Sequence, residues 1–240
     1  MDKIKVIFFD MGNTLLHFHH GKSDDEKDAL GLKYLTEYLN EFNSNITFDE
    51  VKNGFFNSWM EGISDRSKTF VEFPIEAFLN AFLADYKIKL NMDECVQAIN
   101  MFYTEYREQV VFESSLYDTL KEIKAKGCKI GVISNTCYYD EVMKECFKKA
   151  GIYALIDNFT FSYSLKIGKP NMKIFKTAIE DMDVLPEEAM MVGDNLTSDI
   201  KPALDLGMKA IWLNQKNKKT NSEIKPHSEI QSVSEILNYI

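Results

Sequence analysis

The sequence predicts an α/β fold in which a parallel sheet carries an inserted all-helical domain. Short apolar runs rich in Val and Ile recur along the chain, and segments with helical spacing of apolar residues lie between most of them. Such alternation produces a parallel sheet with helices on both faces. Between residues 17 and 112 the alternation stops and only helical patterns occur. We therefore predict a Rossmann-like core with a helical insertion.

Five apolar runs are predicted as strands, because runs this short and apolar are typical of strands buried on both faces. They are Ile4–Asp10, Cys128–Asn135, Phe159–Ser164, Ala189–Asn195 and Met208–Asn214. The stretch from His227 to Ile240 is expected to add an edge strand and a short final helix.

Four helices are predicted in the core, each marked by a cap residue or a terminating glycine. One begins near Ser115 and stops at Gly127, and a second ends at Gly151. A third begins after Asn171, and a fourth ends at Gly207. These signals place the helices between successive strands.

The insertion contains four pieces with apolar residues at helical spacing, namely residues 25–42, 48–63, 74–86 and 92–110. This length is sufficient for a small hydrophobic core of its own. We predict a catalytic core of residues 1–16 and 113–240, and a helical domain of residues 17–112. A ligand cleft is expected where the two parts meet.

The composition restricts the partners and the compartment. A formal net charge of -9 and a pI near 5.1 argue against a nucleic-acid or anionic-membrane partner. The four cysteines lack metal-binding spacing and are expected as free thiols in a reducing cytoplasm. The N-terminal apolar run is too short for a signal peptide, and no run reaches the roughly 20 residues needed to span a bilayer. The sequence contains no indication of oligomeric state.

Polar side chains that suit phosphate chemistry follow several predicted strands. They are Asp10, the pair Ser134 and Asn135, and Asp194 with Asp199 shortly after it. In an open parallel sheet, ligands bind beyond the carboxyl ends of the strands, so we expect these groups to converge. A lysine after the third strand, Lys166 or Lys169, is expected to join them.

Four short motifs, in this order, resemble those of the haloacid dehalogenase superfamily, in the branch with a helical cap inserted after the first strand. They are "FFDMGNTLL", "VISNT", "KIGKP" and "MVGDNLTSDI". Each motif alone is weak, but the ordered set covers nearly the whole chain. The resemblance implies a Mg²⁺-dependent hydrolase that removes phosphate from a small phosphorylated molecule.

The resemblance also implies roles for the acidic residues. Asp10 would be the nucleophile and would form an aspartyl-phosphate intermediate. Asp10 and Asp194 would hold Mg²⁺, a hard cation that prefers oxygen ligands, together with the backbone carbonyl of Gly12. Asp199 would bind a metal-bound water or orient Lys169.

The phosphoryl group would be bound by the remaining motif residues. The Ser134 hydroxyl and the Asn135 backbone N–H would contact its oxygens, and Lys169 would neutralise its charge. Thr14 of the first motif is assigned to the same phosphate-binding set. Each residue also has an ordinary structural explanation, such as a turn or a helix cap. If there were no phosphate site, all of these structural explanations would have to be true at once, at several strand ends.

Gly12 departs from the family pattern, in which phosphatases usually carry a second aspartate two residues after the nucleophile. That residue acts as an acid–base, which is worth about 10²–10⁴ in rate. Three interpretations stay open. The protein is a phosphatase that favours good leaving groups, or another group such as His17, His19 or His20 supplies the proton. Otherwise it is a non-catalytic module that binds a phosphorylated ligand or a partner protein.

Two other activities use related sites. A haloacid dehalogenase uses the same aspartate without a metal, but the acidic pair in "GDNLTSD" favours Mg²⁺. A phosphonate hydrolase would need an imine-forming lysine in the cap, and nothing distinguishes Lys33, Lys52 or Lys68 for this role. Arg66 and Lys68 lie in a predicted surface loop over residues 62–74 that does not identify a substrate.

Overall fold

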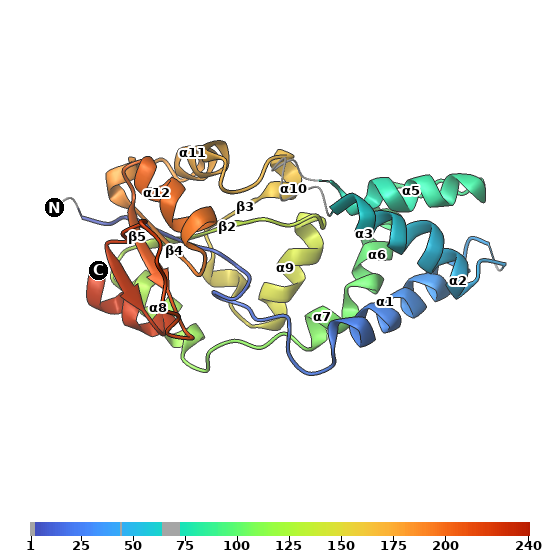
Figure 1. Cartoon of the computed structure of the whole chain (residues 1–240), viewed down its shortest axis with the longest axis horizontal. Helices are drawn as coiled ribbons and strands as arrows, with labels where there is room; N and C mark the ends of the chain where they lie inside the picture. The colour runs from blue at the N-terminus through green and yellow to red at the C-terminus, as the bar shows by residue number, and fades with distance from the viewer. Residues whose placement is uncertain (1–2, 44, 64–72) are drawn as a thin grey trace.

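A six-stranded, wholly parallel sheet forms the centre of the core in the computed structural model, which describes residues 3–43, 45–63 and 73–240 (Figure 1). The strand order is β3-β2-β1-β4-β5-β6. The strands are β1 (Val6–Phe9), β2 (Lys129–Ser134), β3 (Asn158–Phe161), β4 (Ala189–Gly193), β5 (Lys209–Leu213) and β6 (Ser228–Ile230). β1 lies between β2 and β4, at the switch point where sheets of this kind bind ligands.

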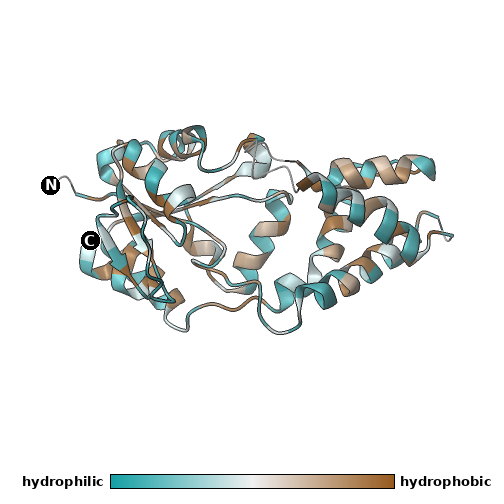
Figure 2. Cartoon of the chain, in the orientation of Figure 1, coloured by the Kyte–Doolittle hydropathy of each residue, from teal (hydrophilic) through white to brown (hydrophobic). Residues whose placement is uncertain are grey.

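The two faces of the sheet are covered by different helices, and the apolar strands run between them (Figure 2). Side chains of β1 alternate between the faces: Ile7 and Phe9 belong to one hydrophobic cluster, and Val6 and Phe8 belong to the other. α8 and α9 pack in the first cluster, and α11 and α12 in the second. The first cluster continues into the helical insertion, so the two parts share apolar packing.

The core helices follow the predicted signals closely. They are α8 (Leu116–Ala125), α9 (Asp140–Lys149), α10 (Ser162–Leu165), α11 (Met172–Asp181) and α12 (Lys201–Asp205). The core also has the 3₁₀-helices η2 (Tyr153–Leu155), η3 (Pro186–Glu188) and η5 (Val233–Tyr239), and the π-helix η4 (Leu196–Ile200). The Asn171 side chain accepts a hydrogen bond from the Lys173 backbone N–H at 2.9 Å, which confirms the predicted start of α11. Gly127, with φ +84°, follows α8 in the left-handed conformation that glycine favours.

One predicted strand is wrong over its second half. β3 ends at Phe161, and the next residues form the short helix α10 instead of extending the strand to Ser164. The Ser162 hydroxyl accepts a hydrogen bond from the Thr136 N–H at 2.8 Å and donates one to the Thr136 carbonyl at 3.1 Å. These two bonds hold Ser162 beside the loop after β2, where the chain turns into α10.

The helical insertion comprises the helices that lie between β1 and β2 in the chain, and they gather at the other end of the molecule from the sheet (Figure 1). They are α1 (Asp24–Leu39), α2 (Phe48–Glu50), η1 (Val51–Phe56), α3 (Asn57–Ile63), α5 (Ile75–Asp85), α6 (Met92–Phe102) and α7 (Thr104–Glu108). Capping boxes at Ser23, Thr47 and Asn91 start three of them. The predicted helix over residues 92–110 is interrupted at Tyr103. Arg66 and Lys68 lie outside the described residues.

The two chain segments that connect the core with the helical insertion run side by side. The His17 N–H donates to the Val111 carbonyl at 2.8 Å, and the Val111 N–H donates to the His17 carbonyl at 3.0 Å. We propose on this basis that the insertion extends over residues 17–112, with residues 1–16 and 113–240 in the core. None of the described helices combines the length and the apolar character needed to cross a membrane.

Candidate active site

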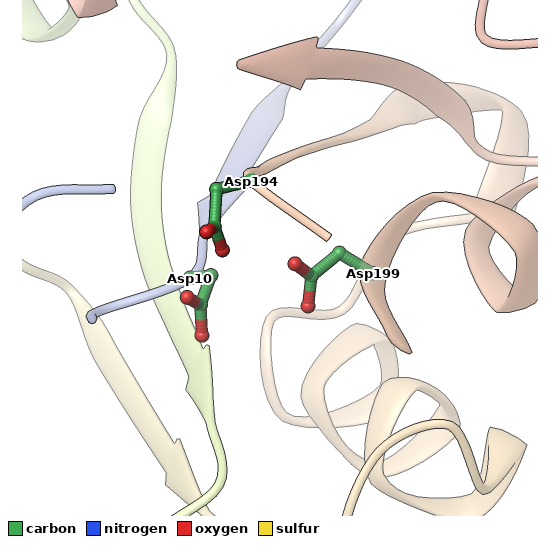
Figure 3. A group of neighbouring side chains, drawn as sticks. All are labelled: Asp10, Asp194 and Asp199. Atoms are coloured by element: carbon green, nitrogen blue, oxygen red, sulfur yellow. The ribbon is translucent and has the colours of Figure 1, made fainter. Parts of the chain in front are cut away.

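Three carboxylates meet at the carboxyl edge of the sheet (Figure 3). Asp10 directly follows β1, Asp194 directly follows β4, and Asp199 lies in η4. One possible ligand oxygen from each lies within 4.8 Å of the others. Parallel strands place their carboxyl ends together, so two of these positions follow from the sheet alone. A donor set made only of carboxylate oxygens suits a hard cation such as Mg²⁺.

Lys169 lies between two of these carboxylates. Its Nζ is 2.5 Å from Asp10 Oδ1 and 2.6 Å from Asp199 Oδ1, and its side chain is almost fully buried. Burial disfavours the charged ammonium, but the charges of Asp10 and Asp199 outweigh this effect and raise the pKa of Lys169. Of the two candidate lysines, the structure places Lys169 at the carboxylates, whereas the Lys166 Nζ lies 3.9 Å from the centre of the Tyr163 ring.

The Asn135 side chain holds the backbone of Lys169 in place. Its Nδ2 donates to the Lys169 carbonyl at 2.9 Å, and its Oδ1 accepts from the Lys169 N–H at 2.7 Å. A Cβ added at Gly168 would lie 2.6 Å from Asn135 Oδ1, so the glycine permits this close approach. The sequence analysis assigned only the backbone of Asn135 to the site and missed this function of its side chain.

Asp199 is almost fully buried, and both of its carboxylate oxygens accept hydrogen bonds. Oδ1 accepts from Lys169, and Oδ2 accepts from the Asn195 N–H at 3.0 Å. A Cβ added at Gly193 would lie 2.5 Å from Asp199 Oδ2, so the last residue of β4 must be small. Burial raises the pKa of Asp199 to about 7 against the opposing charge of Lys169. Burial and the charge of Asp10 likewise raise the pKa of Asp194.

A cleft of about 380 Å³ contains most of the predicted site residues. Those that line it are Asp10, Gly12, Ser134, Asn135, Lys169, Asp194 and Asp199. Thr14 is not among the lining residues, and its buried hydroxyl has no hydrogen-bond partner among the described residues. The structure therefore brings the predicted set together with the exception of Thr14.

Aromatic residues also line the cleft that contains Asp10. Phe18 and Tyr103 lie in the segment 17–112, while Tyr138 follows β2 in the core. The rings of Tyr103 and Tyr138 lie 4.5 Å apart, so they contact each other across the junction of the two parts. The sequence analysis did not assign these residues to the site, because Phe18 and Tyr138 lie in loops without a motif and Tyr103 interrupts a predicted helix.

Gly12 lines the cleft, and the packing around it does not require a glycine at this position. A Cβ added to it would meet no atom within 4 Å, outside its own chain neighbours. The next residue, Asn13, has φ +57°, a left-handed conformation that asparagine adopts more readily than most residues. The site therefore has room for a side chain at the position of the missing aspartate.

The three linker histidines lie outside the cleft around Asp10. His17, His19 and His20 line an adjoining pocket, which reaches the cleft at Asn13 and Asp194. His19 Nδ1 is 2.7 Å from Asp24 Oδ2, so this histidine is hydrogen-bonded at the start of α1. This arrangement does not support the interpretation in which one of them replaces the missing aspartate.

Comparisons with known proteins agree with this geometry. A family model described as haloacid dehalogenase-like hydrolase matches residues 4–207. A glyceraldehyde 3-phosphate phosphatase of Methanocaldococcus jannaschii is 26% identical over 239 residues, which cover 99% of this chain and 97% of that protein.

Solved structures share the whole fold. A haloacid dehalogenase phosphatase from Thermococcus onnurineus is 22% identical, covers 98% of this chain and 97% of its own, and has a TM-score of 0.64. A 2-haloacid dehalogenase from Pseudomonas syringae is 23% identical with the same coverage and a TM-score of 0.65. Because the fold hosts both activities, fold similarity alone does not separate them. The matched family model and the converging strand ends together show that the chain belongs to the haloacid dehalogenase-like hydrolase family.

Proposed function

We propose that this hydrolase is a Mg²⁺-dependent phosphatase that acts on a small phosphorylated molecule through an aspartyl-phosphate intermediate. The observation that carries the proposal is the buried Lys169, which bridges Asp10 and Asp199 beside the third carboxylate of Asp194. A dehalogenase site has no need of three convergent carboxylates. The phosphatase name of a relative that covers nearly the whole chain gives further support.

Asp10 is the proposed nucleophile. Lys169 contacts its Oδ1 and orients the carboxylate. A carboxylate oxygen of Asp10 attacks phosphorus, while the ester oxygen of the substrate leaves with the bonding electron pair and takes a proton from solvent. The aspartyl phosphate is then cleaved by water, which releases inorganic phosphate and restores the Asp10 carboxylate. Positioned cations that neutralise the phosphoryl oxygens are the main requirement of phosphoryl transfer.

The remaining residues position the reactants. Asp10, Asp194 and the Gly12 carbonyl would hold Mg²⁺, which neutralises phosphoryl charge when bound. Asp199 would act chiefly by keeping Lys169 in place, since both of its oxygens already accept hydrogen bonds. Ser134 and the Asn135 N–H would contact the phosphoryl oxygens from the end of β2.

Without an acid at position 12, the leaving alcohol must depart with little proton assistance from that position. We therefore expect the enzyme to favour phosphates with good leaving groups, such as aryl or acyl phosphates. The proposed lack of an acid–base group follows from the absence of a side chain at position 12. The space beside Gly12 is open, so no neighbouring side chain fills the place of the missing carboxylate.

The test is aryl-phosphate turnover with and without Mg²⁺ in the wild type and in Asp10→Asn. We expect Mg²⁺-dependent turnover that Asp10→Asn lowers by at least about 10³-fold, as removal of a nucleophile does. Asp205→Asn is a matched control, since Asp205 is an exposed partner of Lys201 on α12. Wild-type turnover that persists in Asp10→Asn would overturn the nucleophile assignment.

Two further assays on the same protein separate the alternatives. Chloride release from a 2-haloacid without metal would favour a dehalogenase. Mg²⁺-dependent binding of a phosphate mimic without any turnover would favour a module that binds phosphorylated ligands.

A further inference from the structure

A second pocket of about 600 Å³ adjoins the catalytic cleft and shares Asn13 and Asp194 with it. One side is formed by the connecting segments, which contribute the three histidines and Glu113. The other side is the loop after β5, which contributes Lys216 and Lys218. A substrate whose phosphate lies beside Asp10 could extend past Asp194 into this space.

The pocket gathers basic side chains in a protein whose formal net charge is -9. Three of the four histidines of the chain line it, together with Lys216 and Lys218. Burial lowers the pKa of His17, and the nearby charges of His20 and Lys216 lower it further, while Glu113 opposes them. The lowered pKa favours the neutral form of His17, so the positive charge on this side of the site comes from Lys216 and Lys218.

The two carboxylates of the pocket neutralise the lysines only in part. Glu113 accepts hydrogen bonds from neutral groups, Gln215 Nε2 at 3.0 Å and Ser232 Oγ at 2.7 Å, which leave its negative charge in place. Asp194 faces the proposed metal site, and its charge would be compensated there. Lys216 and Lys218 then face the single carboxylate of Glu113, which leaves positive charge that an anionic ligand group would balance.

The loop that carries the two lysines is anchored. The buried Asn214 accepts a hydrogen bond from the Lys218 N–H at 2.9 Å and donates to the Lys218 carbonyl at 3.0 Å and to Glu229 at 2.7 Å. Trp212, at the end of β5, donates from Nε1 to the Asp194 carbonyl at 3.0 Å. The Asn214 bonds fix the shape of the loop, and the Trp212 bond joins β5, which precedes the loop, to Asp194 at the end of β4.

We propose that this pocket binds a second anionic group of the substrate, so that the enzyme selects phosphorylated molecules that carry a phosphate or carboxylate at their other end. The inference rests on the phosphatase function proposed above and specifies its substrate class. Lys216 and Lys218 are the specificity-determining residues, and the histidines contribute hydrogen bonds and, when protonated, charge.

The experiment compares kcat/KM for paired substrates at low salt. Glycerol 3-phosphate and 3-phosphoglycerate differ by a carboxylate, and the monophosphate and bisphosphate of 1,3-propanediol differ by a phosphate. We expect the wild type to prefer the second member of at least one pair about tenfold, as two partly exposed ionic contacts allow. The pair that shows the preference identifies the anion.

The double variant Lys216→Met/Lys218→Met is expected to abolish this preference, mainly through KM. Lys219→Met is the matched control, because it removes the same charge from an exposed neighbour that does not line the pocket, and it keeps the preference. Equal kcat/KM within both pairs in the wild type, or an unchanged preference in the double variant, would overturn the inference.

Failure of the phosphatase proposal has a different signature. It would appear as absence of turnover for every phosphate ester, including aryl phosphates. In that event, calorimetric titration of Mg²⁺-loaded protein with the same four compounds tests the pocket independently. Tighter binding of a two-anion compound that the double variant loses would support the inference, and equal binding would overturn it.

Discussion

The core and the helical insertion each bury a lysine, and they compensate its charge in different ways. Lys169 in the core contacts two carboxylates, at 2.5 and 2.6 Å. Lys27 in α1 is fully buried, and its Nζ donates to the Phe18 carbonyl at 2.7 Å and lies 5.2 Å from the centre of the Tyr106 ring. Its nearest carboxylate oxygen, from the half-exposed Asp24, is 3.8 Å away.

The difference teaches what each lysine does. A buried ammonium next to two carboxylates creates a field at the proposed nucleophile, and removal of any member leaves an unpaired charge. A buried ammonium bound to a neutral carbonyl instead fastens α1 to the linker that enters the helical insertion. The first arrangement is the one that we propose to serve catalysis, and the second holds two segments together.

The largest expected effect is that of Lys169→Met. The variant leaves Asp10 and Asp199 without their buried partner, and we expect the free energy of unfolding to fall by about 3–5 kcal/mol. Turnover should be lost as well. Urea denaturation measures the change, and Mg²⁺ should restore part of the stability by neutralising the carboxylates. Lys173→Met, at an exposed position of α11, is the control. A loss below about 1 kcal/mol would show that the bridge is not important for stability.

The second prediction uses the contrast between two glycines. A Cβ at Gly31 in α1 would lie 2.1 Å from the Phe102 carbonyl oxygen, whereas a Cβ at Gly12 would meet nothing within 4 Å. Gly12→Asp should therefore fold and supply an acid, raising turnover of alkyl phosphates about 10²-fold, or about 2.7 kcal/mol of barrier.

Gly12→Asn is the matched control, because it has a similar shape but no acid. Steady-state kinetics with an alkyl and an aryl phosphate give the readout, and the aryl phosphate should gain less. A fall in both variants would contradict the acid–base explanation and would show that substrate occupies the space beside Gly12.

The smallest effect is expected for Lys27→Met. The Phe18 carbonyl loses its charged donor, but no fully buried carboxylate is left unpaired, so we expect a loss of about 1–2 kcal/mol. Lys33→Met on the same helix, where the lysine is exposed, should cost less than about 0.5 kcal/mol. Chemical denaturation of both variants checks the order. If Lys27→Met proved as destabilising as Lys169→Met, the proposed contrast between the two lysines would fail.

Sequence reasoning predicted the elements well because their signals are local. Apolar runs marked the positions of β1, β2, β4 and β5, and cap residues marked the starts of helices. It was wrong after Phe161, where the hydroxyl of Ser162 bonds to a loop 26 residues away in the chain. A hydrogen bond to a distant segment leaves no periodic trace in the sequence.

The sequence by itself determined which strand ends carry Asp10, Ser134 and Asp194, because parallel strands must bring their carboxyl ends to one edge. Only the tertiary structure decided that Lys169 contacts Asp10 across 159 residues of chain, and that the linker histidines line a neighbouring pocket. Both outcomes depend on how segments that are distant in the chain pack together. Local composition and residue spacing carry no information about that packing. The same holds for the open space beside Gly12, which exists only once its neighbours are in place.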